Sequence, residues 1–385
     1  MPTLVRLATI WISALALCTV ACARSAPPAA PTARPLSTAV APPPPKPTSA
    51  PPSLSAPAEP FASPATAARR PSVVGLRPRV AVLGRLSEAG IVVGLAEGHF
   101  AAQGIEPQPV SVSSAAEALQ ALTSGQVEAA CLPVGADLLN AFARNAPVRI
   151  VAEAAGSAAG HGAIGLLVRS DLVASVRTPT DLRGFRIGLP DRLGDLDVEL
   201  WRLLKQGWLA RTDVDTVPLP SDSLADALRR QQIDAVMVAE PALSALQMRG
   251  VGRVFRRSDE TSPNRTTAVL VMSGRYLRSQ PDAAREFVTG YLRAARAYDD
   301  AVARETPALR PITTEIAELT GLDADDLIRA RLPSINPNGM VNVQSIRADQ
   351  QFLLNSRLQA VAVDLASFID PQYAAFAITQ LGEYR

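Results

Sequence analysis

The sequence predicts an α/β fold made of two similar units and a helical C-terminal segment. Short runs rich in β-branched residues alternate with helix-like stretches between residues 76 and 272. Residues 121–129 (ALTSGQVEA) and 227–235 (ALRRQQIDA) match in detail, each as a helix end, a tight turn and the beginning of a buried strand. Strands that alternate with helices at this spacing indicate βαβ units and a parallel sheet. We therefore expect one such unit in each of two lobes, although any two βαβ units converge on similar patterns.

The N-terminus resembles the export signal of a bacterial lipoprotein. Arg6 supplies a positive charge, and residues 7–17 form an apolar run that is too short to span a bilayer. The tetrapeptide TVAC at residues 19–22 is similar to a lipobox, although threonine stands where leucine is usual. We expect residues 1–21 to be a lipoprotein signal peptide and Cys22 to be lipidated. A plain secretory signal that is cleaved near Ala23 is the alternative.

A proline-rich segment follows the signal. Residues 23–72 consist mainly of Pro, Ala, Ser and Thr, and Glu59 is their only acidic residue. Such a composition buries too little apolar surface to offset the entropy of ordering the chain. Fully extended as polyproline, roughly 50 residues reach on the order of 150 Å. We predict that residues 22–75 are a lipidated cysteine and a disordered tether; a recognition tract for a partner domain is the alternative.

The elements of the folded part can be placed in order. In the first unit we expect strands at 79–83, 109–112, 129–132 and 148–155, and helices at 91–103, 115–124 and 135–145, with Gly104 as a helix C-cap. In the second unit we expect strands at 186–189, 216–219 and 235–238, and helices at 195–206 and 223–231. One more strand at 267–272 precedes helices at 281–305, 311–320, 325–330, 343–355 and 371–381. We expect this helical tail to pack back on a lobe.

Composition excludes several classes of function. A net charge of +2 with 19% charged residues does not suggest a nucleic-acid partner. With only two histidines in the chain, His99 and His161, a histidine-based metal site is nearly excluded. Cys131 is the only thiol after the tether, so no internal disulfide is expected there, and its apolar neighbours indicate a buried core residue. We predict neither a metal nor a cofactor.

Several ordered motifs resemble one family. Residues 94–104 (GLAEGHFAAQG) look like that family's first helix, and residues 122–129 (LTSGQVEA) resemble its "LxxGxxDxA" pattern. Further matches lie at 140–151 (with Asn145 in place of glycine), 180–188, 227–235, 240–241, 337–339 and 368–370. The family is that of ABC-importer solute-binding proteins for nitrate, sulfonates, taurine and thiamine pyrimidines. Each motif alone is weak, whereas their order and spacing from about residue 80 to 382 are specific.

The resemblance implies a two-lobed periplasmic-binding-protein (Venus flytrap) fold. It implies that residues 76–168 and 267–385 form lobe 1, that residues 169–258 form lobe 2, and that residues 259–266 are a return hinge. In open α/β sheets a ligand lies outside the carboxyl ends of the strands, near helix N-termini. We therefore expect the ligand between the lobes, with closure around it.

The candidate ligand-binding residues lie in loops that follow predicted strands. They are Arg85, Ser87, Glu88, Ser113, Ser114, Val134, Gly135, Asp191, Gly194 and Glu240. Ser113 and Ser114 can equally be helix N-caps, and Glu240 can be a charge at a helix N-terminus. Arg85, Arg192 and Arg265 are candidates to pair with an anionic group. Trp201 and Trp208 are expected to pack in the core of lobe 2.

These interpretations favour binding and delivery without catalysis. We expect a lipid-anchored protein on the extracytoplasmic face of the cell membrane that passes a small molecule to an ABC permease and ATPase. The signal, tether and domain together look similar to the riboflavin-binding member of the family, which makes riboflavin the first ligand hypothesis. A thiamine pyrimidine, a sulfonate or taurine, and nitrate stay open. An enzyme similar to the thiamine-pyrimidine synthases is the alternative from another class, but residues 85–90 lack the histidine of those enzymes and the chain lacks their cysteine-rich motif.

Overall fold

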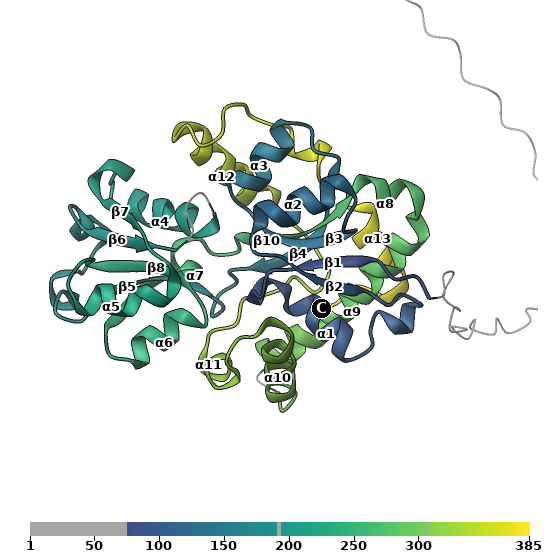
Figure 1. The fold of residues 1–385 in the computed structure, drawn as a ribbon, viewed down its shortest axis with the longest axis horizontal. Helices are drawn as coiled ribbons and strands as arrows, with labels where there is room; N and C mark the ends of the chain where they lie inside the picture. Colours follow the sequence, from purple (N-terminus) through teal and green to yellow (C-terminus); the bar gives the residue numbers. More distant parts are fainter. Residues whose placement is uncertain (1–74, 191–193, 305) are drawn as a thin grey trace, which may run out of the picture. The chain divides into compact units, whose positions relative to one another are not determined.

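The computed structural model describes residues 75–190, 194–304 and 306–385, arranged as in Figure 1. The predicted signal peptide, the predicted lipidation site Cys22 and all of the predicted tether except Gly75 lie outside the described residues. None of the helices in the described part combines the length and the apolar character that crossing a bilayer requires.

The first sheet contains five strands in the order β2-β1-β3-β10-β4. They are β1 (Arg79–Val82), β2 (Gln108–Ser111), β3 (Ala129–Pro133), β4 (Val148–Gly156) and β10 (Thr266–Ser273). β1 pairs in parallel with β2 and β3, whereas β10 runs antiparallel to β3 and β4. Every residue of β10 is buried. A strand that is covered on both faces needs no polar side, and β10 accordingly contains no charged residue.

The second sheet repeats the same topology in the order β7-β6-β8-β5-β9. Its strands are β5 (Ile164–Arg169), β6 (Arg186–Leu189), β7 (Asp215–Pro218), β8 (Ala235–Ala239) and β9 (Gly252–Arg257). β6 is parallel to β7 and β8, and β5 is antiparallel to β8 and β9. The predicted repeat is therefore confirmed, and so is the α/β fold class.

The sequence predicted βαβ units and a parallel sheet; the structure contains parallel pairs in both sheets, but each sheet is mixed. The odd strand is the one that arrives from the other lobe: β5 follows β4 of the first sheet, and β10 follows β9 of the second. A chain that crosses between lobes enters the new sheet at the carboxyl ends of its parallel strands. It must then run away from that edge, antiparallel to the other strands.

The predicted boundary between the lobes also differs from the structure. β5 belongs to the second sheet along its whole length, from Ile164 to Arg169, whereas the sequence placed the boundary at 168/169. The first crossing therefore occupies residues 157–163. The return crossing contains α7 (Ser258–Thr261) and ends where β10 begins at Thr266. No strand was predicted at 164–169 or at 252–257, so the sequence missed both β5 and β9. An apolar segment carries no local signal of which sheet it will join.

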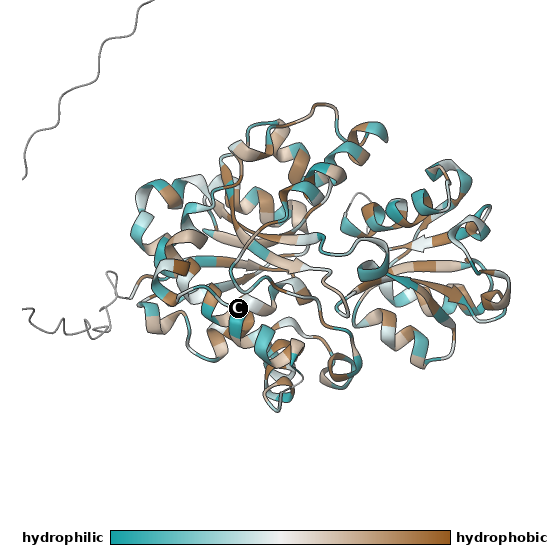
Figure 2. Cartoon of the chain, turned by 180° about the vertical axis from the view of Figure 1, so that it is seen from behind, coloured by the Kyte–Doolittle hydropathy of each residue, from teal (hydrophilic) through white to brown (hydrophobic). Residues whose placement is uncertain are grey.

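Helices cover both faces of each sheet, and their apolar sides face the strands (Figure 2). The first sheet carries α1 (Ala89–Ala96), α2 (Ala115–Ser124), α3 (Ala136–Ala143), α8 (Gly274–Ser279), α9 (Pro281–Ala303), α12 (Val343–Asn355) and α13 (Gln372–Leu381). The second carries α4 (Asp195–Gln206), α5 (Leu224–Arg229) and α6 (Ala242–Met248). One face of the first sheet packs against Phe142 and Phe352, and the other against Phe287 and Tyr291. The helical tail therefore packs on the first sheet.

The helix predicted at 91–103 is shorter in the structure. α1 ends at Ala96, a turn follows with Gly98 at φ 72°, and a separate 3-10 turn spans Ala101–Gln103. This turn folds the Phe100 ring back over Gly94, where a Cβ would come within 2.4 Å of the ring. Gly104 ends the second turn at φ 76°, as a left-handed cap.

Candidate functional site

A cavity of about 550 Å³ lies between the two sheets. It opens at the carboxyl ends of β1, β3, β6 and β8, where the chain leaves the strands at Gly84, Pro133, Pro190 and Glu240. A third wall, the α10–α11 wall, comes from the turn between α10 (Leu309–Thr320) and α11 (Ala324–Arg329) and from the first turn of α11. The volume suits a small molecule, and the position is the usual one for a ligand of open α/β sheets.

The loop after β1 is held by a buried carboxylate. Glu88 is 1% exposed and accepts hydrogen bonds from the backbone N–H groups of Leu83 (2.6 Å), Gly84 (3.0 Å) and Arg85 (3.1 Å). Burial raises the pKa of Glu88, although the three N–H groups oppose that shift. The carboxylate therefore shapes the loop that carries Arg85 and Ser87 to the cavity, and the structure does not bring Glu88 itself to the lining.

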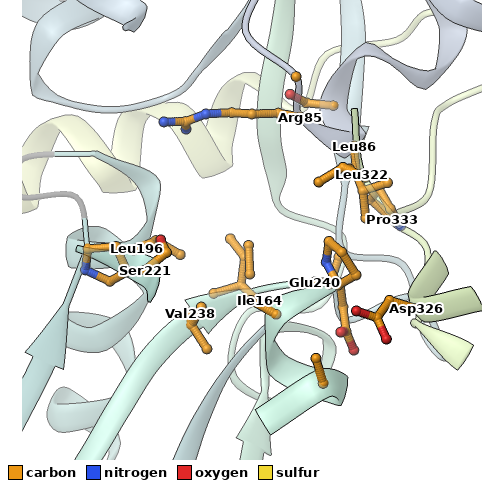
Figure 3. Close-up of a pocket in the computed structure, with 18 of the residues that line it drawn as sticks. Arg85, Leu86, Ile164, Leu196, Ser221, Val238, Glu240, Leu322, Asp326 and Pro333 are labelled. Carbon is orange, nitrogen blue, oxygen red and sulfur yellow. The ribbon is translucent and has the colours of Figure 1, made fainter. Parts of the chain in front are cut away.

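The floor of the cavity is apolar. Ile164 of β5 and Val238 of β8 line it from opposite faces of the second sheet, because Ile164 pairs with Ala239, and Leu196 of α4 packs on the same face as Ile164 (Figure 3). Leu86, Leu322 and Pro333 face this floor from the first lobe and the α10–α11 wall. A molecule held here removes much of its apolar surface from water, which favours binding.

Glu240 lines the cavity, but its carboxylate is bonded within the protein. Its Oε1 accepts hydrogen bonds from Arg257 Nη1 (2.7 Å) and Ser244 Oγ (2.8 Å), and its Oε2 accepts one from Ser244 N–H (2.9 Å). The Arg257 side chain also donates to the Gly162 carbonyl in the first crossing (3.0 Å). The structure therefore gives Glu240 the role of a charge that holds the beginning of α6, one of its two interpretations from sequence.

Charged groups are unevenly distributed around the cavity. Five carboxyl-bearing residues belong to the described lining: Asp195, Asp222, Glu240, Asp323 and Asp326. Two arginines, Arg85 and Arg249, do so as well. Figure 3 shows Arg85 extended along the side of the cavity opposite Ile164 and Val238, and Asp326 beside Glu240.

The remaining candidate residues that the structure describes do not belong to the lining of this cavity. Ser114 is exposed and caps α2 by accepting the Glu117 N–H (3.2 Å), and Ser113 donates its N–H and hydroxyl to the Glu117 carboxylate (2.7 and 2.6 Å). Val134 is fully buried. Gly135 and Gly194 line a separate, narrow recess of about 10 Å³ between α3 and α4. Asp191 and Arg192 lie outside the described residues.

A buried charge cluster joins the lobes beside the cavity. We define it as Glu199 and Arg202 of α4, Asp349 of α12, and Arg265 in the return crossing. Arg265 is 1% exposed and bonds Asp349 (3.0 Å) and Glu199 (3.2 Å), and Arg202 Nε bonds Asp349 (2.9 Å). Arg265, a candidate for binding an anion, is thus engaged in holding α4 and α12 together.

The two tryptophans differ from their predicted places in the core of lobe 2. Trp201 of α4 stacks on Phe352 of α12, with ring centroids 4.3 Å apart, so it forms a contact between lobes. Trp208 is 92% exposed and has a positive φ of 55° just after α4. The helical pattern of the sequence predicted that both residues lie on or just after α4. It could not predict which side chains they contact.

Sequence reasoning missed most of the lining. The apolar floor comes from Ile164 at the start of β5, Val238 of β8 and Leu196 of α4, none of which lies in a loop after a predicted strand. The α10–α11 wall contributes Leu322, Asp323 and Asp326, and nothing local to residues 321–326 indicates that they reach the other lobe. Some missed residues lie next to predicted ones, such as Leu86 between Arg85 and Ser87, and Asp195 after Gly194.

The sequence matches one known protein family. The sequence profile described as the NMT1-like family matches residues 79–310, more than half of the chain. No curated protein matches the chain significantly.

Solved structures with the same fold include binding proteins and an enzyme. An alkanesulfonate-binding protein of Xanthomonas axonopodis pv. citri bound to MOPS is 19% identical, with a TM-score of 0.61, covering 77% of this chain and 99% of that one. The periplasmic nitrate-binding protein of Synechocystis PCC 6803 is 13% identical, with a TM-score of 0.65, covering 82% and 90%. A desulfurization enzyme variant in complex with biphenyl-2-sulfinic acid is 18% identical, with a TM-score of 0.59, covering 79% and 99%.

Proposed function

The chain belongs to the NMT1-like family, and on this premise we propose that it is an extracytoplasmic solute-binding protein of an ABC importer. It captures a small molecule between its two α/β lobes and delivers it to a permease and ATPase. The observation that carries the proposal is the cavity of about 550 Å³ at the carboxyl ends of the strands of both sheets. Proteins with this fold that bind alkanesulfonates and nitrate support it.

The lead ligand in this proposal is riboflavin. Ile164, Leu196 and Leu322 offer aliphatic side chains for an apolar ring, and polar groups in the lining include the Ser87 and Ser221 side chains. Riboflavin combines a flat ring system with carbonyl, NH and hydroxyl groups that are neutral at pH 7. Buried polar contacts discriminate strongly, because an unmatched analogue leaves groups without a hydrogen-bond partner. The competing ligands are a thiamine pyrimidine, a sulfonate or taurine, and nitrate.

The proposal includes a lipid anchor at Cys22 on the extracytoplasmic face of the cell membrane. Its support is the sequence pattern at residues 7–22 and the proline-rich composition that follows. Cys22→Ala should leave the precursor unprocessed or release the protein from the membrane fraction. Normal processing and anchoring of this variant would contradict the anchor without affecting the binding function.

Ligand binding is tested by calorimetry with riboflavin, hydroxymethylpyrimidine, taurine and nitrate. We expect riboflavin to bind with a Kd in the micromolar range or tighter and to lose fluorescence on binding. Ile164→Arg, which places a charge on the apolar floor, should abolish binding. Val361→Arg is the matched control, because Val361 is an exposed aliphatic residue that does not line the cavity. A clear isotherm with taurine or nitrate and none with riboflavin would overturn the ligand assignment.

Binding without turnover is the function we propose, although an enzyme shares the fold. The described lining contains neither a histidine nor a cysteine. Cys131 is fully buried in β3, and burial raises the pKa of its thiol well above the usual range, which disfavours the reactive thiolate. Recovery of the bound ligand unchanged, measured by mass spectrometry after prolonged incubation, is the expected result. A new product would favour the enzyme.

A further inference from the structure

We infer that Asp326 contacts the solute and accepts a hydrogen bond from an NH or OH group that the solute carries. This role of Asp326 rests on the proposed function, and it narrows the solute to molecules that have such a donor. Riboflavin, a thiamine pyrimidine and taurine each have one, whereas nitrate has none.

The Asp326 carboxylate belongs to the lining of the cavity and is partly buried there. Figure 3 shows it beside Glu240, where the α10–α11 wall meets the loop after β8. In the part of the chain that the structure describes, the Asp326 side chain has neither a hydrogen bond nor an ion pair. A carboxylate that is partly withdrawn from water gains a strong hydrogen bond when a donor of the solute reaches it.

The donors of the chain around Glu240 are already engaged. Glu240 Oε1 accepts hydrogen bonds from Arg257 Nη1 (2.7 Å) and Ser244 Oγ (2.8 Å). The Arg331 N–H lies 3.4 Å from the same oxygen. Residue 241 is a proline, which has no N–H. The described residues therefore present a free acceptor to the solute here, and the group that complements it is a donor.

A carboxylate in the first turn of α11 can also act on the helix dipole alone. The helix is capped by Asp323, whose side chain accepts the Asp326 N–H (2.9 Å), and Asp325 is a second acidic residue in the same turn. Asp325 is exposed and does not line the cavity. Asp325 and Asp326 therefore act alike on the helix but differ in access to the solute, which makes Asp325 the matched control.

The test compares Asp326→Ala with Asp325→Ala by calorimetry on the full chain, with riboflavin as the probe. Asp326→Ala should weaken riboflavin binding at least about tenfold, equivalent to about 1.4 kcal/mol, because a hydrogen bond to a charged acceptor is lost. Asp326→Asn keeps one acceptor oxygen and should recover part of this loss. Asp325→Ala should leave the affinity unchanged, and the two alanine variants should have similar melting temperatures.

Analogues of riboflavin assign the contact to a donor of the solute. Lumiflavin lacks the ribityl hydroxyls, and riboflavin methylated on its ring NH lacks the donor of the ring. Asp326→Ala should have no effect on the affinity for the analogue that lacks the contacted donor, as in a double-mutant cycle. An equal loss with riboflavin and with both analogues would show that Asp326 acts without a donor of the solute, and it overturns the inference.

The outcomes separate the inference from the proposed function. An unchanged riboflavin affinity in Asp326→Ala, or an equal loss in Asp325→Ala, overturns the role of Asp326 and leaves the binding function standing. If hydroxymethylpyrimidine or taurine binds in place of riboflavin, the same loss is expected in Asp326→Ala with that ligand, and its absence overturns the inference. Binding of nitrate alone overturns both the inference and the riboflavin assignment. Failure of every compound to bind overturns the proposed function and the inference that rests on it.

Discussion

Buried carboxylates hold together the segments that surround the cavity. Glu88 binds the N–H groups of the loop after β1, Glu240 binds the beginning of α6 together with Arg257, and Glu153 of β4 joins two other segments. Glu153 accepts hydrogen bonds from Thr266 Oγ1 (2.5 Å) and from the Asn336 N–H (3.0 Å). Each of these side chains replaces lost hydration with hydrogen-bond donors of the protein. The donors to Glu88 lie three to five residues away, whereas those to Glu153 lie more than 100 residues away.

Glu153 should make the stability depend on pH. Burial raises its pKa from 4.5 to about 7, so the folded state binds more protons than the unfolded state between these values. The free energy of unfolding contributed by this group is fully present below about pH 4.5 and is lost as the pH rises through about 7. The change is on the order of 3 kcal/mol. Urea unfolding from pH 5 to 8 measures it, and Glu153→Gln should flatten that component; identical slopes for both proteins would contradict the assignment.

A reciprocal pair of substitutions tests backbone strain in the repeated unit. Gly125 after α2 and Gln231 after α5 occupy the same place in the repeat, and their φ angles are 75° and 56°. A side chain costs about 1 kcal/mol in this left-handed conformation. Gln231→Gly should therefore stabilise the protein by roughly 0.5–1 kcal/mol, and Gly125→Gln should destabilise it by a similar amount. Urea unfolding of both variants is the measurement, and changes of the same sign would refute the shared role.

At the scale of elements, the contact between α4 and α12 is one of those that join the two lobes. Trp201 and Phe352 stack there next to the buried charge cluster. The half-buried Trp201 should contribute about 2 kcal/mol, so Trp201→Ala should lower the free energy of unfolding by that amount. Trp208→Ala is the control, because this neighbouring tryptophan is 92% exposed, and it should change stability by less than about 0.5 kcal/mol. Equal effects of the two substitutions would argue against a contact between lobes.

At the scale of the whole molecule, the two lobes should close around the ligand. Two crossings connect the sheets at residues 157–163 and 258–265, and the cavity lies between the sheets. A ligand that binds only the folded, closed protein stabilises it by mass action. Saturating riboflavin should lower the radius of gyration in solution scattering and raise the melting temperature. A ligand that binds by calorimetry but leaves the scattering curve unchanged would count against closure.

The sequence by itself determined the features that depend on near neighbours. Helical period, β-branched runs and turn residues predicted α4 (Asp195–Gln206), β6 (Arg186–Leu189) and α12 (Val343–Asn355) with their observed bounds. The repeat at 121–129 and 227–235 predicted matching units, and the loops after β1 and β8 brought Arg85, Ser87 and Glu240 to the cavity. These predictions succeeded because chirality, side-chain period and turn geometry act within a few residues.

Tertiary structure alone decided what depends on distant segments. It placed β5 in the second sheet, carried Asp323 and Asp326 to the cavity, paired Glu240 with Arg257, and left Trp208 in solvent. A carboxylate that binds a ligand and a carboxylate that binds an arginine of its own chain look the same in the sequence around them. Which partner it meets follows from the packing of segments up to hundreds of residues apart, and that packing minimises the free energy of the whole fold rather than of any single stretch.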